Sequence, residues 1–179
     1  MHEVMEVPEA HGHNENDSLT IPVAVTLSIL AVLVAIATLL GHRASVEEMI
    51  LQTKATDHWA YYQAKNIRLH EMQAVADMLG TLTPVEKEKA EALREKYLKE
   101  AERYGQEKDE VSEQAKDFEK ERDLAGKKQD RFDAGEVILE IALIVCSLTL
   151  LTRKRIFWLS GIVLGLVGFC VTLSGFLLR

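Results

Sequence analysis

The sequence has few cysteines, prolines and aromatic residues, and it contains two long stretches without a single Asp, Glu, Lys or Arg. Two cysteines, Cys146 and Cys170, exclude a disulfide framework, and both lie in apolar stretches where a small side chain serves packing. The uncharged stretches cover residues 18–42 and 156–178. Each exceeds the roughly 20 apolar residues that cross a bilayer as an α-helix. Because charge is segregated in this way, a single soluble core is excluded.

Positive charge is absent from the N-terminal tail, residues 1–18, which carries acids but no Lys or Arg. The formal net charge of −7 argues against a nucleic-acid surface, which needs clustered positive charge. The acidic tail also lacks the basic start of a cleaved signal peptide, so we expect the first apolar segment to stay as an anchor. Its composition predicts disorder.

Motifs of catalysis are missing too. The sequence has no nucleophile elbow, no phosphate-binding loop and no paired acids inside an apolar segment. We therefore expect neither an enzyme nor a bound cofactor.

The apolar pattern predicts an all-α membrane protein with three transmembrane helices, at residues 19–41, 137–152 and 156–178, the last two joined by a basic loop at 153–155. Glu140 falls one turn inside the second span, where a carboxylate can reach the interface.

Residues 42–136 separate the first span from the other two and are predicted to form a long antiparallel helical hairpin with its turn at 80–83. Gly80 suits the left-handed conformation that ends a helix. Thr83 is placed to cap the next helix, Pro84 to begin it and Glu86 to complete a capping box. A further irregularity is predicted between Gly126 and residues 133–136, with Asp133 and Glu136 capping the second span.

A coiled-coil-like seam is predicted along the second arm of this hairpin, because apolar residues recur there every seven positions. The seam is narrow and tolerates alanine, so we expect it to pack against alanines of the first arm. The seam residues are Ala90, Tyr97, Tyr104, Val111, Phe118 and Ala125, and the alanines of the first arm are Ala55, Ala60, Ala64, Ala74 and Ala76.

Small residues recur at spacings of four and three in every predicted span. Such stripes let helices approach closely in a bilayer, where the hydrophobic effect does not drive helix association. The partner is either another span or another copy of the chain. The stripes are Ala24, Ser28, Ala31, Ala35 and Thr38 in the first span, Ala142, Cys146 and Thr149 in the second, and Gly161, Gly165, Gly168, Thr172 and Gly175 in the third.

Two groups of side chains are candidates for binding. The first arm concentrates aromatic and charged residues in a candidate interaction patch, although packing against the second arm explains the aromatics equally well. The histidines of the tail, with nearby glutamates, suit a divalent metal, but a flexible tail gives such ligands no orienting shell. The patch consists of Asp57, His58, Trp59, Tyr61, Tyr62 and Lys65, and the tail histidines are His2, His11 and His13.

The Lys and Arg residues near the ends of the spans give conflicting predictions of the side of the membrane on which the hairpin lies. Arg43 beside the first span places the hairpin in the cytoplasm, whereas residues 153–155 against Arg179 at the third span place it outside. The positive charges around the second span nearly balance. Counted over all three spans, the positive charges near the membrane slightly favour a cytoplasmic hairpin.

Three strings carry a resemblance to a known family: residues 40–43 (Leu-Gly-His-Arg), residues 51–68, with Trp-Ala-Tyr-Tyr-Gln-Ala-Lys at their centre, and residues 152–158, a basic loop followed by Ile-Phe-Trp. They resemble bacterial membrane proteins grouped as domain of unknown function 4337, over roughly residues 19–179. The resemblance implies the layout of three spans and a hairpin, in a bacterial inner membrane. It carries over no activity.

These observations lead to three functional hypotheses. The first is a non-enzymatic membrane scaffold whose hairpin binds a protein partner or assembles copies of the chain into a homo-oligomer in the lipid bilayer. The second is a subunit or regulator of a pore, for which Glu140 is the candidate residue within the spans. The third is a pH or metal sensor that uses the tail histidines.

Overall fold

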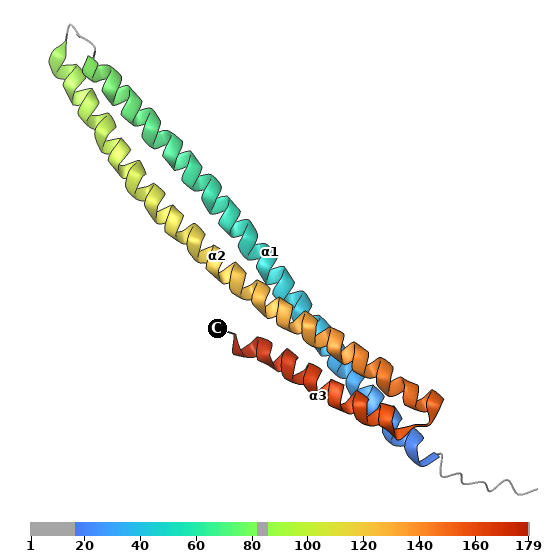
Figure 1. The fold of residues 1–179 in the computed structure, drawn as a ribbon. Helices are drawn as coiled ribbons and strands as arrows, with labels where there is room; N and C mark the ends of the chain where they lie inside the picture. The colour runs from blue at the N-terminus through green and yellow to red at the C-terminus, as the bar shows by residue number, and fades with distance from the viewer. Residues whose placement is uncertain (1–16, 82–85, 179) are drawn as a thin grey trace, which may run out of the picture. The chain divides into compact units, whose positions relative to one another are not determined.

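The computed structural model describes residues 17–81 and 86–178, and all its regular structure over these residues is helical (Figure 1). Helix α1 is Asp17–Thr81, α2 is Lys87–Thr152 and α3 is Arg155–Leu177. Each of the three contains a segment long and apolar enough to cross a membrane. The predicted disordered tail and its histidines fall almost wholly outside the described residues.

Helices α1 and α2 each pass from an apolar segment into a charged one without a break. Alanine, leucine, methionine, glutamate and glutamine dominate the first arm, and these residues favour a helix in either environment. The irregularity expected near Gly126 and residues 133–136 is therefore wrong, and Asp133 caps nothing because α2 runs through it. The glycines there meet close neighbours instead: a Cβ on Gly126 would lie 3.2 Å from a carboxylate oxygen of Glu48.

The end of α1 also differs from the expectation. The helix continues through Gly80 to Thr81, and none of the described glycines has a positive φ, so the predicted left-handed Gly80 is wrong. The predicted cap Thr83 and first helical residue Pro84 lie outside the described residues. Lys87 begins α2, where the amide of Ala90 donates to the carbonyl of Glu86 over 3.2 Å.

The described chain forms two compact units. The first runs up to His42 and resumes at Lys128, so it contains the apolar ends of α1 and α2 together with α3. The second comprises Arg43–Lys127. The core of the first unit combines residues of α1 with residues of α2, and Trp158 and Leu164 of α3 pack against it. These core residues are Val23, Leu30, Ala37, Leu139, Ala142 and Cys146.

The second unit is a helical hairpin-like pair in which the predicted seam of α2 lies against α1. Ala101, Val111, Ala115 and Ala125 of α2 are buried. On α1 the alanine prediction was only partly right. Ala55 and Ala76 are buried, whereas the other three alanines are exposed, because a helix turns about 100° per residue and five such alanines cannot share one face. The exposed three are Ala60, Ala64 and Ala74.

The connection between α2 and α3 is shorter than the predicted basic loop of three residues. Arg153 and Lys154 form it, since Arg155 already begins α3. Arg153 takes a left-handed conformation with φ of 56°, and its amide donates to the carbonyl of Thr149 over 2.8 Å. This two-residue reversal brings the start of α3 back beside α2.

Candidate functional site

The close contact between α2 and α3 in the first unit depends on glycines, which have no side chain to hold the two helices apart. A Cβ on Gly161 would lie 2.8 Å from the Cβ of Cys146, and one on Gly168 would lie 2.9 Å from Cγ of Leu139. Distances this short are closer than carbon atoms pack in proteins. The small-residue stripes predicted for the second and third spans are therefore brought together and buried. They are Ala142, Cys146 and Thr149 on α2, and Gly161, Gly165, Gly168, Thr172 and Gly175 on α3.

Gly135 belongs to the same contact, although the sequence analysis assigned it to a break in the helix. A side chain there would collide with the hydroxyl of Thr172, and its Cβ would lie 2.9 Å from the backbone nitrogen of the same residue. The signal that could have identified it is spacing. Gly135 and Leu139 precede Ala142, Cys146 and Thr149 at the same alternation of four and three.

The stripe predicted for the first span lies elsewhere. Ala24, Ser28, Ala31, Ala35 and Thr38 are all exposed, so the structure does not bring them to the other two stripes. A different face of α1 fills the core in their place, with residues spaced by seven: Val23, Leu30 and Ala37.

Polar side chains tie α1 to its neighbours at two points of the first unit. The Thr38 hydroxyl lies 2.6 Å from a carboxylate oxygen of Glu136 and can donate to it. The indole of Trp158 donates to the Thr26 hydroxyl over 3.1 Å. The side chain of Glu140, the candidate of the pore hypothesis, is exposed instead of turned into the three-helix core.

A glycine comparison tests this packing. We expect Gly135→Ala to lower the stability of the purified protein in detergent by about 1–3 kcal/mol, because its Cβ would meet backbone atoms that cannot rotate away. Unfolding by a denaturing detergent, followed by circular dichroism, measures the change.

The matched control is Gly105→Ala, also within α2. No atom lies within 4 Å of its Cβ position, so the gain in helix propensity should raise stability, by up to about 1 kcal/mol. Equal effects of the two substitutions would show that close approach does not restrict Gly135.

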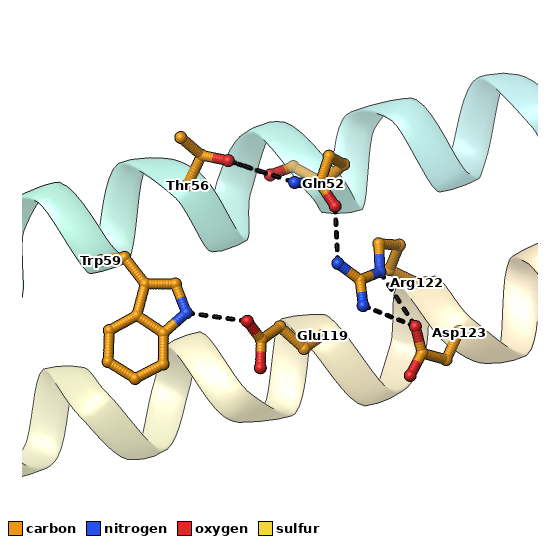
Figure 2. Close-up of polar contacts among 6 residues, drawn as sticks. All are labelled: Gln52, Thr56, Trp59, Glu119, Arg122 and Asp123. Carbon is orange, nitrogen blue, oxygen red and sulfur yellow. Dashed lines mark hydrogen bonds and ion pairs between the residues drawn. The ribbon is translucent and has the colours of Figure 1, made fainter.

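Polar contacts join the two helices of the second unit along one seam (Figure 2). The indole nitrogen of Trp59 donates to a carboxylate oxygen of Glu119 over 2.9 Å. One turn further along α2, the Arg122 guanidinium donates to Gln52 over 2.7 Å and also pairs with Asp123 on its own helix. These contacts fix the rotation of each helix about its axis, because each needs particular atoms to face one another.

Cations stacked on aromatic rings continue the seam. Lys65 forms a salt bridge with Glu107, and its ammonium lies 4.9 Å from the ring centre of Tyr61 and 5.2 Å from that of Tyr104. Lys108 of α2 lies 5.7 Å from the ring centre of Tyr62 on α1. Each lysine ammonium therefore interacts with a ring on the opposite helix, and the aliphatic part of each lysine side chain packs between α1 and α2.

Most side chains of the candidate interaction patch lie in the contact between α1 and α2. His58 stacks against Phe118 with ring centres 4.9 Å apart, and Trp59 meets Tyr62 edge-on at 5.4 Å. Together with Lys65, these residues are half-buried between α1 and α2, whereas Asp57 and Tyr61 are exposed. Packing against the second arm, the alternative considered from the sequence, describes where the structure places the aromatics.

The salt bridge across the seam shifts two pKa values. The hydrogen bond from Lys65 holds the pKa of Glu107 below its ordinary value, and the same bond raises the pKa of Lys65. A lowered carboxyl pKa contributes stability that is present above the ordinary value and is lost as pH falls through the lowered one. The raised lysine pKa contributes stability below the ordinary lysine value, lost as pH rises through the raised one.

A double-mutant cycle with Lys65→Met and Glu107→Gln tests this pair. We expect a favourable coupling at pH 7 that declines once the pH falls below the ordinary glutamate pKa, because the unfolded chain then takes up a proton that the paired Glu107 excludes. Trp59 fluorescence during unfolding, in a Trp158→Phe background, reports on the second unit alone. A coupling unchanged down to about pH 3 would contradict the assignment of the shift to the Lys65 contact.

Across residues 17–81 and 86–178, no three side chains of His, Cys, Asp or Glu lie close enough together to hold a metal ion. The tail histidines proposed as metal ligands lie outside this range. What the described side chains do in common is join helices.

The fold and its contacts define an all-helical class of protein whose three helices are long and apolar enough to cross a membrane. The chain belongs to the family DUF4337, a domain of unknown function, which it matches over residues 19–178. No curated protein and no solved structure shows significant similarity to it.

Proposed function

We propose that this chain is an integral membrane protein that works by contact, as a scaffold that holds a helical hairpin away from the bilayer. Residues 19–41, 137–152 and 156–178 cross the membrane, and residues 42–136 form the hairpin with antiparallel arms. The hairpin binds a protein partner or further copies of the chain.

The surface of the first unit supports insertion in a membrane. Large apolar side chains on all three of its helices are exposed, and such a surface in water would cost free energy over its whole area. Hydrocarbon removes this cost. The exposed apolar side chains include Ile29, Ile36, Ile144, Val163, Leu166 and Phe176.

The order of contacts supports an antiparallel hairpin. Gln52 contacts Arg122, Trp59 contacts Glu119 and Lys65 contacts Glu107, so residue numbers rise along α1 as they fall along α2.

The observation that carries the scaffold proposal is the seam of the second unit. The His58–Phe118 ring contact, the half-buried salt bridge of Lys65 with Glu107 and the hydrogen bond from Trp59 to Glu119 all act between the two arms, so we expect the paired arms to form a stiff rod. A rod of this kind presents fixed outer surfaces and is suited to binding by shape and charge.

Thiol labelling tests the membrane arrangement. In a background with Cys146→Ala and Cys170→Ala, we expect Thr81→Cys to react with a membrane-impermeant maleimide from one side of sealed vesicles only. Leu166→Cys should stay unreactive even after permeabilisation, because hydrocarbon surrounds it. Release of the protein by alkaline carbonate, or equal reactivity at both positions, would overturn the arrangement.

A photoreactive residue at position 61 tests the scaffold itself, since Tyr61 is half exposed beside the seam. In native membranes we expect one or a few discrete adducts whose yield exceeds that from the same group at Gln106, an exposed site on α2. Yields at position 61 no higher than at position 106 would count against a specific contact surface there.

A further inference from the structure

The α1 arm of the hairpin has a second face that no part of the described chain covers. Leu51 and Ala55 point toward α2 and are buried, and the residues that point the opposite way are exposed. We define this outer face by Val46, Met49, Ala60, Ala64, Ile67 and Met78. Met49 is 68% exposed, Ile67 58% and Met78 59%.

Charge distinguishes this face from the corresponding face of α2. Between Val46 and Met78, all of which the structure describes, Glu71 is the one charged residue within about 40° of the direction of Ala60. The outward face of α2 is charged at nearly every turn, as an exposed helix in water normally is. Its exposed residues include Glu95, Lys99, Glu102, Asp109, Glu113 and Asp117.

Two threonines on the outer face do not make it polar. The Thr53 hydroxyl donates to the carbonyl of Met49 and the Thr56 hydroxyl to that of Gln52, each over 2.9 Å. Their hydrogen-bonding needs are met within α1, so they add methyl groups to the face. These two hydroxyls therefore keep their hydrogen bonds when a partner covers the face and water is excluded.

The spacing on this face suits another helix. Val46, Thr53, Ala60, Ile67 and Ala74 lie seven apart, the repeat by which helices pair in a coiled coil. Alanines at its centre allow a close approach, and the larger residues toward both ends supply side chains that insert between those of a partner. The occupant must therefore be a narrow helical stripe of similar length that carries little charge.

We propose that the outer face of α1 pairs with the same face of a second copy of this chain. The inference rests on the proposed membrane scaffold, because anchors in one bilayer hold the α1 arms of two copies parallel and on the same side. The chain itself supplies a stripe of the required width and length, with Glu71 as the one charged residue near its centre line.

The area of the face agrees with a contact that depends on the membrane. From Val46 to Met78 the helix is about 50 Å long, and with a helix width of about 10 Å the contact covers about 500 Å² on each copy. The total of about 1,000 Å² is at the lower limit for a specific interface. Confinement to one bilayer raises the effective concentration and offsets this weakness.

Disulfide crosslinking of the full chain in lipid vesicles tests the pairing. In the background with Cys146→Ala and Cys170→Ala, we expect Ala60→Cys and Ile67→Cys to form dimers on mild oxidation at least about tenfold more than Gln106→Cys, the matched exposed control on α2. The difference should persist when the vesicles are diluted with excess lipid. Equal yields at the three positions, or no dimer at any, would overturn the proposal.

Charge on the face provides an independent check on the Ala60→Cys yield. Glu71→Gln should raise it, because two like charges face each other across a parallel pair, and Ala64→Glu should lower it several-fold. Opposite responses would exclude pairing through this face.

An internal crosslink separates this proposal from the hairpin on which it rests. Gln52→Cys with Arg122→Cys should form a disulfide within one chain if the arms are paired as described. Its formation without dimers at Ala60→Cys would overturn the pairing and leave the hairpin in place. Failure of the internal crosslink would overturn both.

Discussion

Two helices can approach only as far as the side chains between them allow, and the first unit depends on that limit. The two-residue connection at Arg153 and Lys154 returns the chain directly onto α2, so α3 has to lie close beside it. Glycines at 135, 161 and 168 remove the atoms that would keep the backbones apart. In the membrane arrangement proposed above, dispersion contacts along the pair replace the hydrophobic effect, which is absent between helices in hydrocarbon.

The two helices of the second unit are joined by aromatic and charged residues instead of glycines. In the proposed arrangement its two arms lie in water and must exclude solvent from the side on which they meet, and the seam offers few large aliphatic side chains for this purpose. Rings from both helices supply the apolar area, and lysines lie across the rings with their stems packed and their ammonium groups paired. Each cross-helix bond also fixes the register, because a shift by one turn would separate Trp59 from Glu119.

Sequence pattern predicted the all-helical class, the three apolar segments, the seam of α2 and the family, because each follows from local composition or from periodicity along one helix. It did not predict which face of a helix meets a neighbour. Ala24 and Val23 are adjacent in the chain, yet only Val23 enters the core. Periodicity identifies residues that share a face, whereas the choice between faces depends on the volume that the other helices leave.

Glycine was ambiguous for a related reason. Sequence pattern indicated a helix end at Gly80 and an irregularity at Gly126; α1 does end one residue after Gly80, at Thr81, whereas Gly126 lies inside the continuous α2. A glycine that ends a helix and a glycine that admits a neighbour look the same in sequence. What separates them is an atom from elsewhere in the chain, such as the Glu48 carboxylate 3.2 Å from the Cβ position of Gly126.

The contrast between the two units has a consequence for their response to salt. Contacts between backbone and small side chains in the first unit involve no net charge, so ionic strength leaves them unchanged. The arms of the second unit are joined by the Lys65–Glu107 ion pair and by cations over rings of the opposite helix, and the part of these attractions that solvent reaches is screened once the Debye length falls to a few ångströms in concentrated salt. Concentrated salt therefore loosens the arms of the hairpin selectively and leaves the packing of the apolar helices intact.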